Sequence, residues 1–128
     1  MLLNYQDPDY VHWGYPAHYT RGIGIIDQSL RTIVAHADAH PAYRDNTVFV
    51  VVPDCGRDDN PLLRTPFQHH FNSRSAREIW ALFVGPRVPR ARVVNREVQQ
   101  VDVARTIATL LGVRAPSMQG ETLREAIA

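Results

Sequence analysis

Two uninterrupted apolar runs constrain the fold of this chain more than any other feature. The first, residues 47–52 (TVFVVV), is closed by Pro53-Asp54, and the second, residues 79–84 (IWALFV), is closed by Gly85-Pro86. Runs that are apolar on both faces and rich in β-branched and aromatic residues are typical of central strands in a parallel sheet. We therefore predict that residues 47–53 and 79–84 form neighbouring central strands.

The segments before and after these runs have the periodicity of helices. Apolar residues recur every three or four positions from about Pro16 to His40, which predicts a helix over residues 17–39 that packs on the sheet. A second helix is predicted after Asp102, which we expect to be its N-cap, with Gly112 at the C′ position. A last helical turn is predicted over residues 122–127. The order of elements predicts an α/β fold with flanking helices, a single domain over residues 1–128.

Charge, cysteine usage and hydropathy exclude several functional classes. The net charge is +1, so neither a nucleic-acid-binding surface nor an acidic tail is indicated. The only cysteine, Cys55, excludes an internal disulfide. No leader is visible, and no apolar run approaches the roughly 20 residues of a membrane span. We expect a soluble, cytoplasmic chain, unless an upstream leader has been lost.

Three polar clusters lie in predicted loops or at strand ends, and they contain Asp7, Asp9 and His12; Asp54 and Cys55; and His69 and His70. Residues 7–18 are predicted to be a loop, and residues 55–77 a second, unusually long one, which is uncommon unless it works at a site. Oxygen, nitrogen and sulfur donors from separate segments suit zinc or manganese better than calcium. Each cluster alone also fits ordinary turn or solvated-loop chemistry.

The order of motifs resembles the C-terminal half of alkaline-phosphatase-superfamily enzymes, which include sulfatases, nucleotide pyrophosphatases and cofactor-independent phosphoglycerate mutases. The motifs are D..H, an amphipathic helix, TVFVVVPDCG, a loop with histidines, EIWALFVGP, and QQVDVARTIATLLGV followed by QGETL. In that family the strand typically ends in Asp-His-Gly. The resemblance implies an alkaline-phosphatase-like sheet with flanking helices, of which only the C-terminal part is present.

The resemblance also implies roles for individual residues. Asp9 and His12 correspond to two ligands of a first metal, and either His69 or His70 to its third. Asp54 corresponds to a ligand of a second metal, with Cys55 where the family usually has histidine. Apart from the resemblance, Arg57 lies beside the predicted metal loop and is a candidate for holding a substrate anion, with an ordinary solvated loop arginine as the alternative. Whether Asp7 takes the place of Asp9 is left open, and Asp102 corresponds to a structural position.

The activity implied is metal-dependent hydrolysis of a small phosphate or sulfate ester, with zinc or manganese as the cofactor and calcium as a third option. In the family the nucleophile comes from an N-terminal half that does not precede Met1 here, so we expect the isolated chain to be inactive. The alternatives are a non-catalytic remnant that binds a metal or a partner, and one chain of a split enzyme completed by a complementary N-terminal chain. Uncovered apolar sheet surface predicts self-association.

Overall fold

The computed structural model describes residues 1–13, 16–58, 62, 68–69 and 72–127. Contacts between residues divide the chain into two compact units. The first unit consists of Met1–Asp45 and Val52–Trp80, and the second of Asn46–Val51 and Ala81–Ala128. All the candidate metal ligands fall within the first unit.

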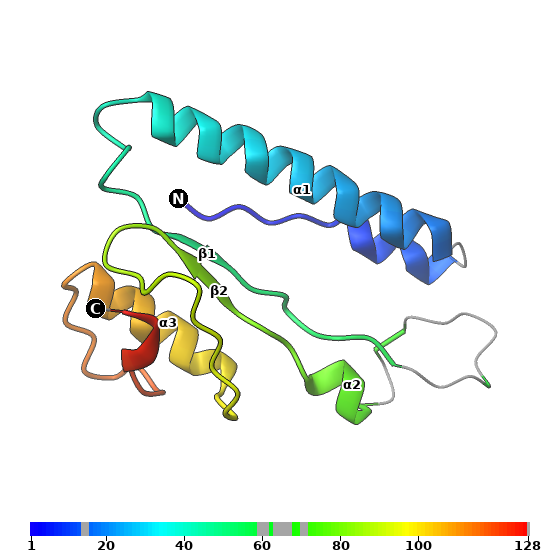
Figure 1. Ribbon diagram of the computed structural model, residues 1–128. Helices are drawn as coiled ribbons and strands as arrows, with labels where there is room; N and C mark the ends of the chain where they lie inside the picture. The colour runs from blue at the N-terminus through cyan, green and yellow to red at the C-terminus, as the bar shows by residue number, and fades with distance from the viewer. Residues whose placement is uncertain (14–15, 59–61, 63–67, 70–71, 128) are drawn as a thin grey trace. The chain divides into compact units, whose positions relative to one another are not determined.

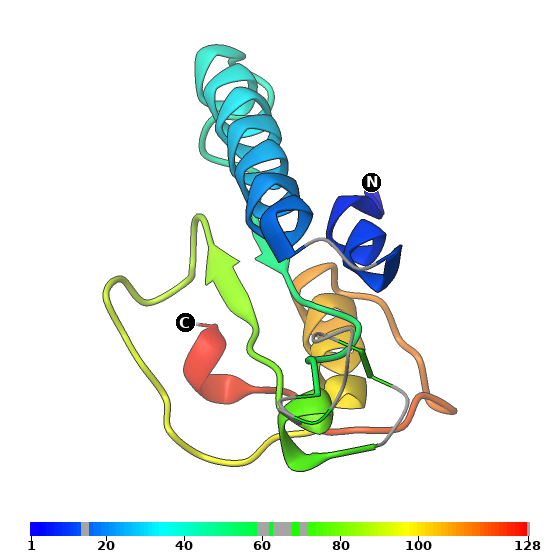
Figure 2. The same cartoon turned by 90° about the vertical axis from the view of Figure 1, so that its right-hand side faces the viewer.

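The first unit contains the 3₁₀ helix η1 (Asp7–Trp13) and the α-helices α1 (Pro16–Ala39) and α2 (Arg74–Arg77). Figures 1 and 2 both show η1 lying beside the N-terminal turns of α1. The helix predicted over residues 17–39 is confirmed. The predicted loops are wrong in part, because η1 lies within residues 7–18 and α2 within residues 55–77.

The α1 helix is 24 residues long, but polar side chains occur along its whole length. Among the described residues, no helix combines the length and the hydropathy that crossing a bilayer would require.

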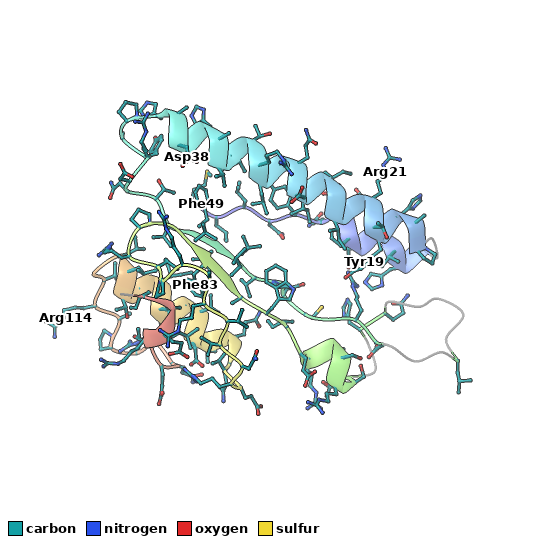
Figure 3. The ribbon with its side chains drawn as sticks, in the orientation of Figure 1. Tyr19, Arg21, Asp38, Phe49, Phe83 and Arg114 are labelled. Atoms are coloured by element: carbon teal, nitrogen blue, oxygen red, sulfur yellow. The ribbon has the colours of Figure 1, made fainter. Side chains whose placement is uncertain are left out.

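The second unit contains a sheet of two strands, β1 (Phe49–Val51) and β2 (Leu82–Val84), as drawn in Figure 1. Phe49 pairs with Val84 and Val51 with Leu82, so the strands are antiparallel. Figure 3 labels Phe49 and Phe83, one on each strand. The predicted neighbour relation is confirmed, and the predicted parallel direction is wrong.

The sheet also differs from the predicted one in burial. Leu82 and Val84 are each 48% exposed, whereas central strands of a parallel sheet are covered on both faces. Parallel strands are usually joined by a long crossover helix, and the helix described between β1 and β2 is the four-residue α2. A continuous apolar run specifies an extended segment but says nothing about the direction of its partner.

The α-helix α3 (Gln100–Leu110) holds the end of the chain through two buried polar side chains. The carboxylate of Asp102 accepts from the backbone N–H groups of Gln99 and Glu121, both at 2.8 Å. The hydroxyl of Thr106 donates to the Asp102 carbonyl at 2.7 Å and accepts from the Leu123 N–H at 2.9 Å. The Asp-Val-Ala-Arg-Thr motif therefore holds the Gly-Glu-Thr-Leu motif in place by hydrogen bonds from two of its side chains.

The boundaries of α3 correct one prediction and confirm another. Gln99 is the N-cap, and Asp102 stands at the N3 position, where its carboxylate reaches back to the N-cap backbone. Gly112 has a φ of +67°, as expected of a C′ glycine. The last turn is the 3₁₀ helix η2 (Arg124–Ala126), shorter than the predicted turn over residues 122–127.

Replacing Asp102 by asparagine should change the acid stability of the protein. The N–H groups of Glu121 and Gln99 lower the pKa of Asp102 below its usual value. A carboxylate with a lowered folded-state pKa stabilises the fold above its unfolded pKa of about 3.9, and this contribution is lost as the pH falls through the folded pKa. We expect Asp102→Asn to cost about 1–3 kcal/mol of unfolding free energy at pH 7 and less at pH 2.5.

Urea unfolding between pH 7 and pH 2.5 measures this difference. The exposed Glu97 supplies a control in the same unit, since Glu97→Gln should leave the unfolding free energy almost unchanged. An equal loss for Asp102→Asn at both pH values would show that the charge of Asp102 does not contribute.

Candidate metal centre

Asp9 and His12 face the same side because they lie on a 3₁₀ helix. In such a helix three residues make one turn, so side chains at positions i and i+3 lie directly above one another. The Oδ1 atom of Asp9 is 2.8 Å from Nε2 of His12. The His12 side chain is 19% exposed and that of Asp9 62% exposed, so the pair opens to solvent on the Asp9 side.

The position of η1 is set by contacts with α1. Val11 is fully buried, and Gly22 is buried on the facing side of α1. A Cβ atom at Gly22 would lie 2.9 Å from the carbonyl carbon of Asp7 and 3.0 Å from the nitrogen of Pro8. The backbone of η1 therefore approaches α1 at a place where only a glycine leaves room.

Arg57 brings a positive charge against the pair. Its Nη1 atom is 3.0 Å from Nε2 of His12, and its Nη2 donates to Oδ1 of Asp9 at 3.4 Å. The Arg57 side chain is 16% exposed, and its guanidinium carbon lies 5.7 Å from the centre of the Tyr19 ring. Figure 3 shows Tyr19 pointing away from α1 on the side of this contact. Arg57 was predicted to hold an anion, and here it contacts two of the candidate ligands.

The segment that carries Arg57 is fixed by the residues on either side of it. The Gly56 N–H donates to the Ala76 carbonyl at 2.7 Å, and a Cβ atom at Gly56 would lie 2.0 Å from the Ser75 carbonyl oxygen. Asp58 is 3% exposed, and its carboxylate accepts from the hydroxyl and the N–H of Ser73. The backbone of residues 56–58 is thereby attached to α2.

Asp58 also positions the third candidate ligand. Its N–H donates to the Gln68 carbonyl at 2.5 Å. This bond joins the residue before His69 to the residue after Arg57. The ring of His69 contacts that of His12 edge-on, with the ring centres 4.9 Å apart. Sequence reasoning missed Asp58, because an aspartate in a polar loop carries no sign that it will be buried.

The candidate donor atoms of Asp9, His12 and His69 all lie within 4.8 Å of one another. Among the described residues they form the one group of at least three histidine, cysteine or acidic side chains with this property. Asp7 belongs to η1 but not to this group. His70 lies outside the described residues, so the structure places His69 and makes no comparison between the two histidines.

Asp54 and Cys55 form a separate pair, in which the Cys55 N–H donates to Oδ1 of Asp54 at 2.9 Å. Within the described part of the chain they join no group of three possible ligands. Burial raises the pKa of the Cys55 thiol, the Asp54 carboxylate raises it further, and Arg57 opposes both. Binding of zinc by Cys55 would therefore require the release of the thiol proton.

The chemistry of the three converging donors favours zinc or manganese over calcium. Structural and catalytic zinc sites use imidazole and carboxylate groups at about 2.0–2.2 Å, often with water in the remaining position. Calcium takes six to eight oxygen ligands, and here two of the three donors are nitrogens. Zinc bonds of this length bring the donor atoms to roughly 3–4 Å from one another, so the set would contract slightly around an ion.

Comparisons with known proteins identify no relative of the chain, since it matches no family model, no curated protein and no solved structure.

Proposed function

We propose that the chain provides the metal site of a metal-dependent hydrolase that acts on phosphate or sulfate esters, with Asp9, His12 and His69 as ligands of one zinc or manganese ion. The convergence of a carboxylate and an imidazole from η1 with an imidazole from a second, distant segment is the observation that carries this proposal. An arginine beside them adds a group that binds anionic oxygens in pairs. The order of sequence motifs supports the ester as the substrate class.

Each residue of the site has a separate task in this proposal. A bound divalent ion would supply Lewis acidity toward an ester oxygen. Asp9 supplies negative charge, and the two imidazoles supply directional bonds. Arg57 binds the non-bridging oxygens of the ester through its parallel N–H groups, and Tyr19 supports the guanidinium from one side. Arg57 and Tyr19 thus orient the anionic group of the substrate.

A second candidate function is metal binding without turnover. The observation in its favour is that Asp54 and Cys55 join no group of three possible ligands among the described residues. An in-line displacement clamped by two ions needs two such groups about 3.5–4 Å apart. The chain by itself would then bind a metal and leave esters intact.

Metal titration combined with an ester assay tests both candidates. We expect one zinc ion per chain by isothermal titration calorimetry, and turnover of aryl phosphates and aryl sulfates close to the protein-free rate, because a single ion cannot clamp both the attacking and the leaving oxygen.

The possible results differ in what they exclude. Absence of zinc and manganese binding would exclude both candidate functions. Turnover that requires the metal and disappears with a chelator would exclude metal binding without turnover. Two zinc ions per chain would show a second site, for which Asp54 with Cys55 and the His36–His40 pair are the candidates.

A further inference from the structure

We infer that Arg57 competes with a metal ion for Asp9 and His12, and that metal binding releases its guanidinium to bind the anion of the substrate. The inference rests on the proposed function, since it concerns the regulation of the same site. It assigns to Arg57 a role in coupling metal binding to anion binding, in addition to holding the substrate.

The contacts of Arg57 coincide with those that a metal ion would make. Its guanidinium reaches Oδ1 of Asp9 and Nε2 of His12, the two atoms of this pair that lie 2.8 Å apart. The Asp9 oxygen accepts from Arg57, and His12 Nε2 does so in the tautomer that carries no proton there, the same tautomer that would bind a divalent cation. Arg57 and the ion therefore compete for the same electron pairs.

Hydrogen-bond chemistry shows that the arginine satisfies this pair only in part. The Nε2 atom of a neutral imidazole either carries a proton or accepts one, but does not do both. If Nε2 accepts from Arg57, it faces the Asp9 oxygen with no proton between them. If Nε2 donates to Asp9, it meets an N–H of Arg57. A divalent ion removes this conflict, because Oδ1 and Nε2 can both bind it.

The surroundings of Arg57 keep the guanidinium nearby after it is displaced. The backbone on either side is held by the Gly56 and Asp58 contacts with α2, so displacement changes the side-chain rotamer and not the loop. The Tyr19 ring offers a surface on which a guanidinium can rest. From there the five N–H donors face the solvent side of the site, where an ester anion would arrive.

Coupling of this kind is reciprocal. If an anion draws Arg57 away from Asp9, it removes the competitor and raises the metal affinity by the same factor by which the metal raises the anion affinity. Because Asp9 is largely exposed, its interaction with Arg57 is moderate. The coupling expected is roughly 1.5- to 5-fold, the range of a partly exposed charge pair.

The test measures zinc dissociation constants for the wild-type chain and for Arg57→Gln, in chloride and in sulfate buffers of equal ionic strength. The free zinc concentration is corrected for pairing with sulfate. The wild-type chain should bind zinc roughly 1.5- to 5-fold more tightly in sulfate. Arg57→Gln should bind zinc that much more tightly than wild type in chloride, with no further gain from sulfate.

A matched control is Arg31→Gln, which removes the same charge from an exposed position on α1 where Arg31 pairs with Asp27. Its zinc affinity should equal that of wild type in both buffers. If Arg57→Gln does not fold, Arg57→Lys replaces it, because an ammonium group lacks the planar N–H fork of a guanidinium, should compete less well for the two ligand atoms and should also raise the affinity in chloride.

The outcomes separate this inference from the proposed function. Zinc binding that is weakened or unchanged by Arg57→Gln, together with no effect of sulfate on the wild-type chain, would overturn the inference and leave the metal site standing. Failure of every form of the chain to bind zinc or manganese would overturn the metal site itself.

Discussion

The His12→Ala substitution should weaken zinc binding by roughly 100-fold or more. Even the loss of a group that only orients a metal ligand typically lowers metal affinity about 10- to 100-fold, and His12 is itself a proposed ligand. His12 is the central member of the site. Its ring contacts Asp9, Arg57 and His69, so His12→Ala removes one ligand and the surface against which the others are placed. Competition with a chromophoric chelator at pH 7 measures the change in the zinc dissociation constant.

A second pair of histidines makes the control for this experiment informative. His36 and His40, at the end of α1, are four residues apart, and their ring centres are 6.3 Å apart. Residues at this spacing lie on one face of a helix and can bind a transition metal together. His36→Ala should leave the zinc affinity unchanged. If His36→Ala weakens binding and His12→Ala does not, the zinc binds at the end of α1 and our assignment is wrong.

Replacing Gly22 by alanine should destabilise the first unit and weaken zinc binding together. The added Cβ atom would overlap the backbone of Asp7 and Pro8, which cannot rotate away as a flexible side chain would. Overpacking of a close contact costs about 1–3 kcal/mol of unfolding free energy. Because the contact also sets the position of η1, relief by movement of η1 would carry Asp9 and His12 away from His69. Urea unfolding and a zinc titration report the two effects.

Gly24 is a matched control two residues further along the same helix. A Cβ atom at Gly24 would meet no atom within 4 Å, so the substitution adds helix propensity without a clash. Gly24→Ala should therefore stabilise the chain by up to about 1 kcal/mol and leave zinc binding unchanged. If both substitutions stabilise the chain, the close approach of η1 to α1 at Gly22 does not exist in solution.

The parts of the fold that could be predicted from the sequence are those that depend on local periodicity. The helix over residues 17–39 followed from an apolar pattern that repeats every three or four residues. The two apolar runs predicted strands, and these strands do pair. The antiparallel direction depends on the chain between the strands, whose hydrophobic pattern gave no indication of α2 or of the absence of a crossover helix among the described residues.

The same distinction applies to the candidate site. Asp9 and His12 could be grouped as candidate ligands because they lie three residues apart in one polar cluster, and that spacing is a local property. The contacts that hold them in place join residues far apart in the sequence. Gly22 lies against the backbone of Asp7, Gly56 lies against the Ser75 carbonyl, and the Asp58 carboxylate accepts from the Ser73 N–H. Each of these contacts joins segments at least fifteen residues apart, and the types of the residues involved do not predict it.

The 3₁₀ form of η1 has a consequence for what a bound ion would do to the backbone. In an α-helix each residue turns about 100°, so side chains three positions apart would point about 60° away from each other. The same sequence wound as an α-helix would turn the side chains of Asp9 and His12 apart by this angle, although they would remain neighbours. An ion that bridges these two atoms consequently favours the winding in which they lie directly above one another. Metal binding would then stabilise the 3₁₀ winding of η1 relative to an α-helical winding of the same residues.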